Sequence, residues 1–376
     1  MPESKLTVVQ VVPALHSGGV ERGTLEVAAE LVRRGHRSLV VSGGGRLVEQ
    51  LEAEGSEHIS WAIGRKSPAT LRHVRPLRRL LIERGANILH ARSRTPAWVA
   101  HLAWRRMPTA IRPAWVTTCH GLHSVSRYSA IMTSGQRVIA VSRTVESYIR
   151  ENYPAVPLDR VRVIHRGVDP ARFPRGYQPN PQWRSQWLAA HPELVGARVL
   201  ALPGRLTRLK GHLDLVELLR RLGHRDAPVV GLVIGGEESG RKGYVREIRE
   251  RAAEAGLKNL VFAGHRPDIR EVYAASDLVL ALSRRPESFG RTVLEALSLG
   301  VPVVGYDLGG VGEVLGEIYP AGRVPCGDVD QLAERVEQFL SDPPPVPDSI
   351  PWTLKAMLDQ TIDLYHEVAG VAARAS

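Results

Sequence analysis

The sequence contains only two cysteines in 376 residues, Cys119 and Cys326, and they show neither a CxxC pattern nor the spacing of a metal site. Two isolated thiols fit a reducing cytoplasm better than a disulfide framework. No apolar run is long enough to span a bilayer. The start, "MPESKLTVVQVV", lacks the basic and then apolar regions of a secretory leader. We therefore expect a cytoplasmic protein.

Several nucleotide-binding and nucleic-acid-binding signatures are also missing. The glycines in "PALHSGGVER", Gly18 and Gly19, fit neither GxGxxG nor GxxxxGK[ST], which disfavours a nicotinamide site and an NTPase. The chain has no RNP, zinc-finger or helix-turn-helix signature, so nucleic acid is not an expected partner. It also has no low-complexity tract, and its 43% apolar and 24% charged residues are typical of a globular protein.

Positive charge is in excess, with a formal net charge of +11 and a pI near 10.0. Much of it lies in two N-terminal stretches, Arg65–Gly85 and Trp98–Trp115, and the second also holds three of the seven tryptophans. Basic residues beside Trp and Leu favour a surface that rests on an anionic membrane. Solvated helix faces with tryptophans in the core are the alternative interpretation.

Strands and helices alternate along the chain, which predicts two parallel sheets with helices on both faces, an α/β fold. With 376 residues, two domains are expected. The Pro-, Gly- and Arg-rich stretch "RGVDPARFPRGYQPNPQ" predicts a linker at 171–185. It separates an N-terminal domain at 1–170 from a C-terminal domain at 186–350, and the last helix, about 353–376, is expected to complete the first domain. Ligands are expected in a crevice at the carboxyl ends of the strands.

Two Gly-containing loops at strand ends are candidate phosphate sites. Gly18 and Gly19 lie before a predicted helix, whose N-terminal N–H groups can bind an anion. In "ALPGRLTRLKGH", Arg205 and Lys210 follow a strand, and two cations beside a helix suit a diphosphate. A tight turn and a solvated basic loop are the respective alternatives.

Two glutamates stand eight residues apart in "RPESFGRTVLEALSLGVPVVG". The pattern predicts a loop with Ser288 as N-cap, a short apolar helix ended by Gly300, and a buried strand over 301–305. Glu287 would precede this helix and Glu295 would lie about one turn inside it. Carboxylates repel phosphate but accept hydrogen bonds from hydroxyls, so the pair suits a sugar and a ribose on either side of a diphosphate, as in a nucleotide-sugar. The alternative is that Glu287 interacts with the helix dipole and Glu295 lies on the surface.

Histidines and arginines follow strands of the first domain. His120 in "TTCHG" would face the expected crevice, although a lone histidine is often structural. His90 in "NILHARSR" is a similar, less clear case. Arg92 and Arg94 beyond it could hold an anionic acceptor.

These motifs together resemble the retaining glycosyltransferases of family 4, which have the GT-B fold of two Rossmann-like domains. The resemblance rests on E-x7-E at Glu287 and Glu295, on "GGVER", "GRLTRLKG" and "VIHRGVD", and on the later segments "DLGGVGEVL" and "GRVPCGDVDQLAERV". It covers almost the whole chain in the expected order. Two segments depart from the family pattern: "VIHRGVD" has His-Arg where Pro-Asn is frequent, and "GGEESGRKGYVREI" replaces a short Gly-Asp-Gly turn, which affects contacts near Glu237.

The resemblance implies a role for each matching position. Glu295 would bind the ribose hydroxyls and Glu287 those of the donor sugar, while Arg205 and Lys210 would neutralise the diphosphate. His120 would contact the sugar near the reacting carbon. The backbone at Gly18, Gly19, Phe289, Gly290, Thr292 and Val293 would meet the phosphates or the sugar.

The resemblance further implies that a sugar is transferred from a nucleotide-diphosphate sugar with retention of configuration, as in lipopolysaccharide-core transferases. We expect no metal and no other cofactor, because Arg205, Lys210 and the helix N-terminus supply the positive charge. The expected acceptor is a lipid-linked glycan or glycolipid at the inner face of an anionic plasma membrane. A nucleotide-sugar 2-epimerase of the same fold and a non-catalytic scaffold are the alternatives.

Overall fold

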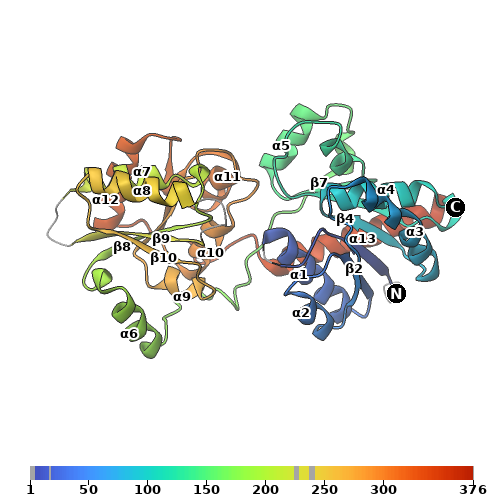
Figure 1. Cartoon of the computed structure of the whole chain (residues 1–376), viewed down its shortest axis with the longest axis horizontal. Helices are drawn as coiled ribbons and strands as arrows, with labels where there is room; N and C mark the ends of the chain where they lie inside the picture. The colour runs from blue at the N-terminus through green and yellow to red at the C-terminus, as the bar shows by residue number, and fades with distance from the viewer. Residues whose placement is uncertain (1–4, 17, 224–227, 237–241, 376) are drawn as a thin grey trace. The chain divides into compact units, whose positions relative to one another are not determined.

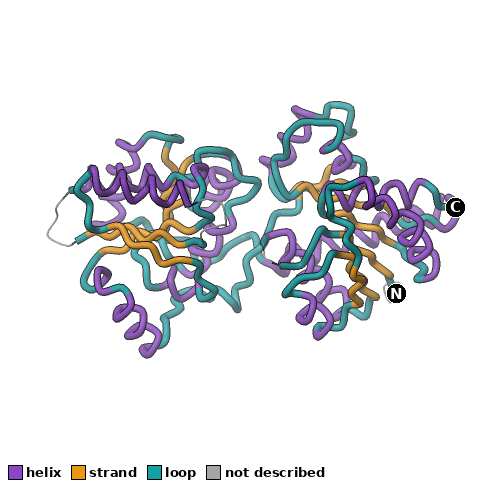
Figure 2. Tube along the Cα trace, viewed as in Figure 1, coloured by secondary structure: helices purple, strands orange, loops and turns teal. Residues whose placement is uncertain are grey.

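The computed structural model describes residues 5–16, 18–223, 228–236 and 242–375. The chain divides into two compact units: unit 1 contains Met1–His165 and Lys355–Ser376, and unit 2 contains Arg166–Leu354. Each unit is a parallel β-sheet with helices packed around it (Figures 1 and 2). This is the α/β architecture that the alternation of strands and helices predicts.

Unit 1 is built on a seven-stranded sheet. Its strands are β1 (Thr7–Val11), β2 (Arg37–Ser42), β3 (Glu57–Ser60), β4 (Ile88–Ala91), β5 (Ala114–Cys119), β6 (Arg137–Ala140) and β7 (Val161–Val163). Its helices are α1 (Gly19–Arg33), α2 (Val48–Ala53), α3 (Val74–Glu83), α4 (Arg94–Arg105), α5 (Arg143–Asn152) and α13 (Leu354–Ala375), with short 3-10 turns η1 (Pro68–His73), η2 (Thr109–Ile111), η3 (Ser129–Thr133) and η4 (Leu158–Arg160). The strand order is β3-β2-β1-β4-β5-β6-β7, so the direction of winding reverses between β1 and β4.

The outer strands β3 and β7 were not predicted from the sequence. β3 is a four-residue strand whose side chains are half-buried or exposed, and β7 has three residues. Both pair with one neighbour at an edge of the sheet. Short edge strands lack the apolar run that identifies the central strands.

The tryptophans of the Trp98–Trp115 stretch contact the body of unit 1. Trp115 on β5 is fully buried. The indole N–H of Trp104 donates to the carbonyl of Pro113 at 2.8 Å, and that of Trp98 donates to the carbonyl of Tyr128 at 3.0 Å. For these three residues the structure matches the core interpretation better than the membrane one.

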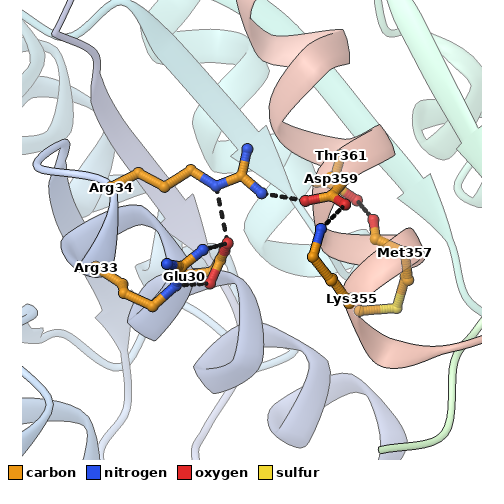
Figure 3. Close-up of polar contacts among 7 residues, drawn as sticks. All are labelled: Glu30, Arg33, Arg34, Lys355, Met357, Asp359 and Thr361. Atoms are coloured by element: carbon orange, nitrogen blue, oxygen red, sulfur yellow. Dashed lines mark hydrogen bonds and ion pairs between the residues drawn. The ribbon is translucent and has the colours of Figure 1, made fainter.

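The C-terminal helix α13 belongs to unit 1. The Tyr365 hydroxyl lies 2.6 Å from Nδ1 of His90 on β4, and both residues are fully buried. A charged cluster joins the start of α13 to the end of α1 (Figure 3). There Asp359 pairs with Arg34 and, at 2.6 Å, with Lys355, while Arg34 also binds Glu30 at 2.8 Å.

No helix in the described part of the chain is long and apolar enough to cross a bilayer.

Unit 2 is built on a six-stranded sheet. Its strands are β8 (Arg198–Pro203), β9 (Val229–Ile234), β10 (Leu260–Gly264), β11 (Leu278–Ala281), β12 (Val303–Tyr306) and β13 (Arg323–Val324). Its helices are α6 (Pro181–Ala190), α7 (His212–Leu222), α8 (Lys242–Glu254), α9 (Ile269–Ala274), α10 (Arg291–Leu299), α11 (Gly309–Ile318) and α12 (Val329–Ser341), with 3-10 turns η5 (Pro192–Leu194), η6 (Arg208–Lys210) and η7 (Pro320–Gly322). The order β10-β9-β8-β11-β12-β13 reverses between β8 and β11.

The predicted linker at 171–185 packs as part of unit 2. Phe173 is 2% exposed within the core of this unit, and α6 already begins at Pro181. Nearby, the Val168 amide donates to the Trp352 carbonyl at 3.0 Å, and the Leu354 amide donates to the Val168 carbonyl at 2.7 Å. Proline and glycine thus mark an irregular but packed segment, and the units divide at 165/166 and 354/355.

Candidate functional site

The candidate donor-binding residues of unit 2 lie in loops at the carboxyl ends of β8 and β11. The loop after β8 carries Arg205 and Lys210, and the loop after β11 carries Glu287 and leads into α10. These two strands are neighbours and mark the reversal of strand order. Loops at such a reversal diverge to opposite faces of the sheet, which leaves room for a ligand. Arg205 is exposed there, whereas Lys210 is partly covered.

The structure brings Lys210 and Glu287 into contact. The ammonium Nζ of Lys210 lies 2.6 Å from Oε1 of Glu287, and their side chains are 20% and 29% exposed. The Ser283 hydroxyl donates to the same carboxylate oxygen. This geometry places a cation beside a carboxylate at the carboxyl ends of β8 and β11, and the nucleotide-sugar role of the pair stays a prediction.

Glu295 is buried, so the alternative that it is a surface residue is wrong. Its side chain is 9% exposed, and its Oε1 accepts a hydrogen bond from Nε of Arg291 at 2.9 Å. A buried carboxylate is costly unless it is paired and hydrogen-bonded. Arg291 meets part of this requirement from one turn earlier on α10, an i,i+4 pair.

The N-terminus of α10 differs from the prediction in its cap. Gly290, rather than Ser288, is the N-cap residue, and no side chain caps the helix. The first backbone N–H groups of a helix have no partner within the helix, so they can bind an anion. Phe289 and Val293 are 7% and 0% exposed, which leaves mainly their backbone for a ligand, and Thr292 is half-buried.

Two glycines after β12, Gly309 and Gly310, allow the start of α11 to lie close to the loop that carries Glu287. The amide of Gly310 donates to the carbonyl of Glu287 at 2.7 Å. A Cβ on Gly310 would lie 2.4 Å from the Cα of Phe289, and one on Gly309, whose φ is +56°, would lie 2.8 Å from the Cα of Pro286. The loop that carries Glu287 is therefore held by backbone contacts that only glycine permits.

Burial keeps His212, the residue two positions after Lys210, neutral near pH 7. It begins α7, is fully buried, and burial lowers its pKa to about 4. The charges of this loop that can face an anion therefore come from its lysine and arginines.

In unit 1, Gly18 and Gly19 lie at the start of α1. Gly18 is the N-cap with a φ of 142°, and Gly19 is the first helical residue. Both are exposed, and no atom lies within 4 Å of the position that a Cβ on Gly19 would occupy. The Glu21 carboxylate lies 2.6 Å from the position that a Cβ on Gly18 would occupy, and the phosphate-binding role of the two glycines stays a prediction.

The other candidates of unit 1 differ in their exposure. His120 follows β5 and is half-buried. Arg92 is 4% exposed, and its Nη1 donates to Oε1 of Gln10 at 2.9 Å, so its guanidinium lies inside the unit rather than on its surface. Arg94 is half-buried at the start of α4, where its Nη1 donates to the Ser129 hydroxyl at 3.2 Å. The acceptor-binding role of these arginines stays a prediction, and it is weaker for Arg92.

The expectation of a metal-free site rested in part on the absence of an Asp-x-Asp motif, and this premise is wrong, because the sequence contains one such triplet, Asp328-Val329-Asp330. Asp328 caps α12 by accepting the Gln331 amide at 3.0 Å, and Asp330 pairs with Arg221. Among the described residues, no three His, Cys, Asp or Glu side chains form a group that could hold a metal ion. The segment 237–241, which includes Glu237, lies outside the described residues.

Two contacts of the site were missed by sequence reasoning. Arg291 stands four residues before Glu295, a spacing that predicts an ion pair on a helix. Ser283 also stands four residues before Glu287, but the two lie in a loop, where spacing alone predicts no contact.

Family models match both units. The model described as "Glycosyltransferase Family 4" matches residues 17–172, and the model described as "Glycosyl transferases group 1" matches residues 184–350. The solved structure of a glycosyltransferase from Rickettsia africae ESF-5 is 30% identical in sequence, covers 97% of this chain and 98% of its own, and superposes with a TM-score of 0.85.

Two curated relatives match over shorter segments. The 2-deoxystreptamine glucosyltransferase of Streptomyces kanamyceticus is 34% identical over 155 residues, which is 40% of this chain and 38% of that protein. The lipopolysaccharide core biosynthesis mannosyltransferase LpsB of Rhizobium meliloti is 31% identical over 187 residues, which is 48% of this chain and 51% of that protein. The chain thus spans about half, or less, of the length of these relatives. From the two family models and the Rickettsia structure, the chain belongs to the group 1 glycosyltransferases of family 4 and has their GT-B fold.

Proposed function

We propose that this chain is a retaining glycosyltransferase that moves a sugar from a nucleotide-diphosphate sugar to a cell-envelope acceptor without a metal ion. The observation that carries the proposal is the contact of Lys210 with Glu287, three residues before the N-cap of α10, a helix that holds the buried Glu295 one turn from its start. Cations and carboxylates at this spacing fit the alternating anionic and hydroxyl-bearing parts of a nucleotide-sugar.

The donor would bind along the carboxyl ends of β8 and β11. Lys210, Arg205 and the first amides of α10 would surround the diphosphate, because each supplies positive charge or N–H donors. Glu287 would accept hydrogen bonds from the sugar and Glu295 from the ribose. Arg291 donates to one oxygen of Glu295 and would help to orient the carboxylate toward the ribose.

Charge on the leaving group is the main chemical problem of this reaction. As the bond to the sugar breaks, negative charge grows on the nucleotide diphosphate and positive charge on the sugar ring. Fixed donors aimed at the developing charge lower the barrier. Lys210 and Arg205 would stabilise the departing diphosphate, which can take the proton of an acceptor that attacks from the same face, and His120 would contact the sugar.

A thermal-shift screen tests the donor site first. UDP-, GDP- and ADP-sugars are added to the whole chain with and without EDTA, and the melting temperature is followed. A ligand at about 100 times its Kd adds about 2.7 kcal/mol to the free energy of unfolding. We expect one nucleotide class to raise the melting temperature, EDTA to leave the shift unchanged, and Glu295→Ala to abolish it. The matched variant Glu250→Ala, on the exposed side of α8, keeps the shift.

Two outcomes would contradict the proposal. A shift that EDTA removes would contradict the metal-free site, and the absence of a shift with every nucleotide would favour the scaffold alternative. Product analysis with the stabilising donor then separates transfer from epimerisation, because an epimerase changes the donor sugar without any acceptor.

The acceptor is proposed to lie at an anionic membrane. Helix α3 exposes Arg75, Arg78 and Arg79, and two apolar side chains beside them, Leu71 and Ile82, are 51% and 45% exposed. Basic residues next to exposed apolar ones favour binding to anionic lipid headgroups. LpsB acts in lipopolysaccharide core biosynthesis according to its name, and we propose a lipid-linked glycan of that kind as the acceptor.

Vesicle flotation tests this surface. Wild type should float with anionic vesicles at low salt and remain at the bottom with neutral vesicles. Replacing Arg75, Arg78 and Arg79 by glutamine should abolish flotation, whereas the same replacement of Arg246, Arg249 and Arg251, which are exposed in unit 2, should not. If both triple variants lose flotation equally, the net charge of the protein explains membrane binding, and the proposal of a specific surface on α3 is contradicted.

A further inference from the structure

Asp214 is a buried acid of unit 2 that the proposed chemistry does not use. It lies in the first turn of α7 and is 5% exposed. Its carboxylate binds the guanidinium of Arg284 through two hydrogen bonds, from Nε at 2.7 Å and from Nη2 at 2.6 Å. A two-point contact of this kind fixes the orientation of both groups as well as their distance.

A third residue completes the arrangement. The hydroxyl of Tyr306, at the end of β12, donates to Oδ2 of Asp214 at 2.7 Å. Burial raises the pKa of Tyr306, which keeps the hydroxyl protonated as a donor, and the hydrogen bonds of Asp214 raise the pKa of Arg284. Asp214 therefore joins the segments that follow β8 and β11 to the last residue of β12, and these three strands are adjacent.

Both residues of this ion pair are close in sequence to donor-binding residues: Asp214 stands four residues after Lys210, and Arg284 stands three before Glu287. Arg284 stands between Ser283, which binds Glu287, and the rest of the loop before α10. Its own amide donates to the carbonyl of Leu209 at 2.8 Å, one residue before Lys210. The side-chain pair and this backbone bond thus connect the loop of Glu287 to the loop of Lys210.

We propose that Asp214 and Arg284 are positioning residues that hold the β11–α10 loop against η6, so that Lys210 and Glu287 meet the diphosphate and the sugar in a fixed geometry. The proposal rests on the function proposed above. It assigns no contact with the donor to either residue. A displacement of about 1 Å in such a site can lower the rate of reaction about 100-fold, so the geometry of the loop matters to turnover.

The variant Asp214→Asn tests the pair, with Asp277→Asn as its matched control. Asp277 also binds an arginine, Arg198, at 2.8 Å and accepts the Val199 amide at 2.8 Å, but at the amino ends of β8 and β11. We expect Asp214→Asn to lower kcat at least tenfold with a change in donor KM of less than about threefold. The control should lower the melting temperature comparably and leave kcat within about twofold. Equal effects of both variants on kcat would overturn the proposal.

Conservative variants separate positioning from charge. Arg284→Lys keeps the charge but provides no two-point contact, so kcat should still fall. The double variant Asp214→Asn with Arg284→Gln replaces the ion pair by two amides that can bond to each other. It should be no slower than Asp214→Asn alone. Independent, multiplying losses in the double variant would contradict a unit formed by these two residues.

Hydrogen exchange of the free protein separates failure of this inference from failure of the proposed function, because it requires no donor. In Asp214→Asn, the amides of residues 282–290 and 208–211 should exchange faster than in wild type, while those of β9 and β10 keep their rates. A uniform rise across unit 2 would show a purely structural role, whatever reaction the protein performs.

Discussion

The ammonium of Lys210 lies 2.6 Å from the carboxylate of Glu287, although the two residues are 77 positions apart in the chain. The lysine is therefore held in place before any donor arrives, and a diphosphate would compete with the carboxylate for its charge. The orientation of Lys210 toward the end of β11 is thus set by Glu287 and by the loops that carry the two residues.

The first prediction concerns Lys210. Lys210→Ala removes a point charge from the leaving group and leaves Glu287 without its cation, so we expect turnover to fall at least tenfold, which corresponds to about 1.4 kcal/mol. Initial rates at saturating donor measure the effect. Lys258→Ala, which removes an exposed lysine of the same unit, should keep the wild-type rate. A near-normal rate for Lys210→Ala would contradict the assignment of Lys210 to the diphosphate site.

The second prediction concerns Glu295. Glu295→Gln keeps the size of this buried side chain but weakens its bond with Arg291 and its acceptance of ribose hydroxyls. We expect donor affinity to fall at least tenfold, because hydrogen bonds to charged groups contribute about 1.5–3 kcal/mol. Calorimetric titration with the nucleotide alone, without its sugar, measures the loss. An unchanged affinity would assign the ribose to other residues.

The third prediction concerns Gly211, which separates Lys210 from α7. Its φ is +73°, and a Cβ there would lie 2.1 Å from the carbonyl oxygen of Leu282. Gly256 has a φ of +68° but no atom within 4 Å of such a Cβ. Gly256→Ala should therefore cost about 1 kcal/mol of unfolding free energy, the backbone effect alone. Gly211→Ala should cost about 3 kcal/mol or more, because the loops must also separate.

Denaturant unfolding followed by circular dichroism compares the two glycine variants. If both lose the same free energy, the close approach of Gly211 to Leu282 contributes nothing to stability. Donor binding should be lost in Gly211→Ala and kept in Gly256→Ala, since only the first substitution displaces Lys210.

The fourth prediction concerns the charged cluster between α1 and α13. The hydrogen bond from Arg33 lowers the pKa of Glu30, and the one from Lys355 lowers the pKa of Asp359. Acids with a lowered pKa in the folded state stabilise the fold above their ordinary pKa values of 4.5 and 3.8, and this contribution is lost as the pH falls through the folded values. Acidification below these values should therefore destabilise unit 1.

Asp359→Asn provides the measurement. Its melting temperature should lie below that of wild type at pH 7, and the difference should shrink as the pH is lowered toward 3. Asp363→Asn, an exposed site on the same helix, serves as the control and should change the melting temperature little at either pH. A difference between Asp359→Asn and wild type that stays constant over this range would contradict the role of Asp359.

Local features of the fold were predictable because they depend on neighbours in sequence. The apolar helix before Gly300 is observed as Arg291–Leu299, and Gly300 has the left-handed conformation of a C-cap, with a φ of 83°. The helix Gly309–Ile318 was missed, since four of its ten residues are glycine. Gly309 and Gly310, at its start, disfavour helix formation but permit the close contact with the loop of Glu287.

The site was predictable where strand ends determine position and unpredictable where distant partners do. Glu287 and Lys210 follow adjacent parallel strands, so their proximity followed from the fold. The buried Arg92 donates to Gln10, 82 residues away, and the contact of Arg284 with Asp214 spans 70 residues. No pattern in the sequence reveals which of many arginines meets which acid or amide.

The return of α13 to unit 1 has a consequence for the order of events on the ribosome. His90 obtains the hydroxyl of Tyr365 only after the intervening chain, 275 residues in separation, has been synthesised. A nascent chain that has released only residues 1–165 therefore lacks the hydroxyl that lies against Nδ1 of this histidine on β4, although its Nε2 already has Thr118 as a partner. N-terminal domains often fold first during synthesis. In this protein unit 1 can bind its last helix, α13, only after all of unit 2 has been synthesised.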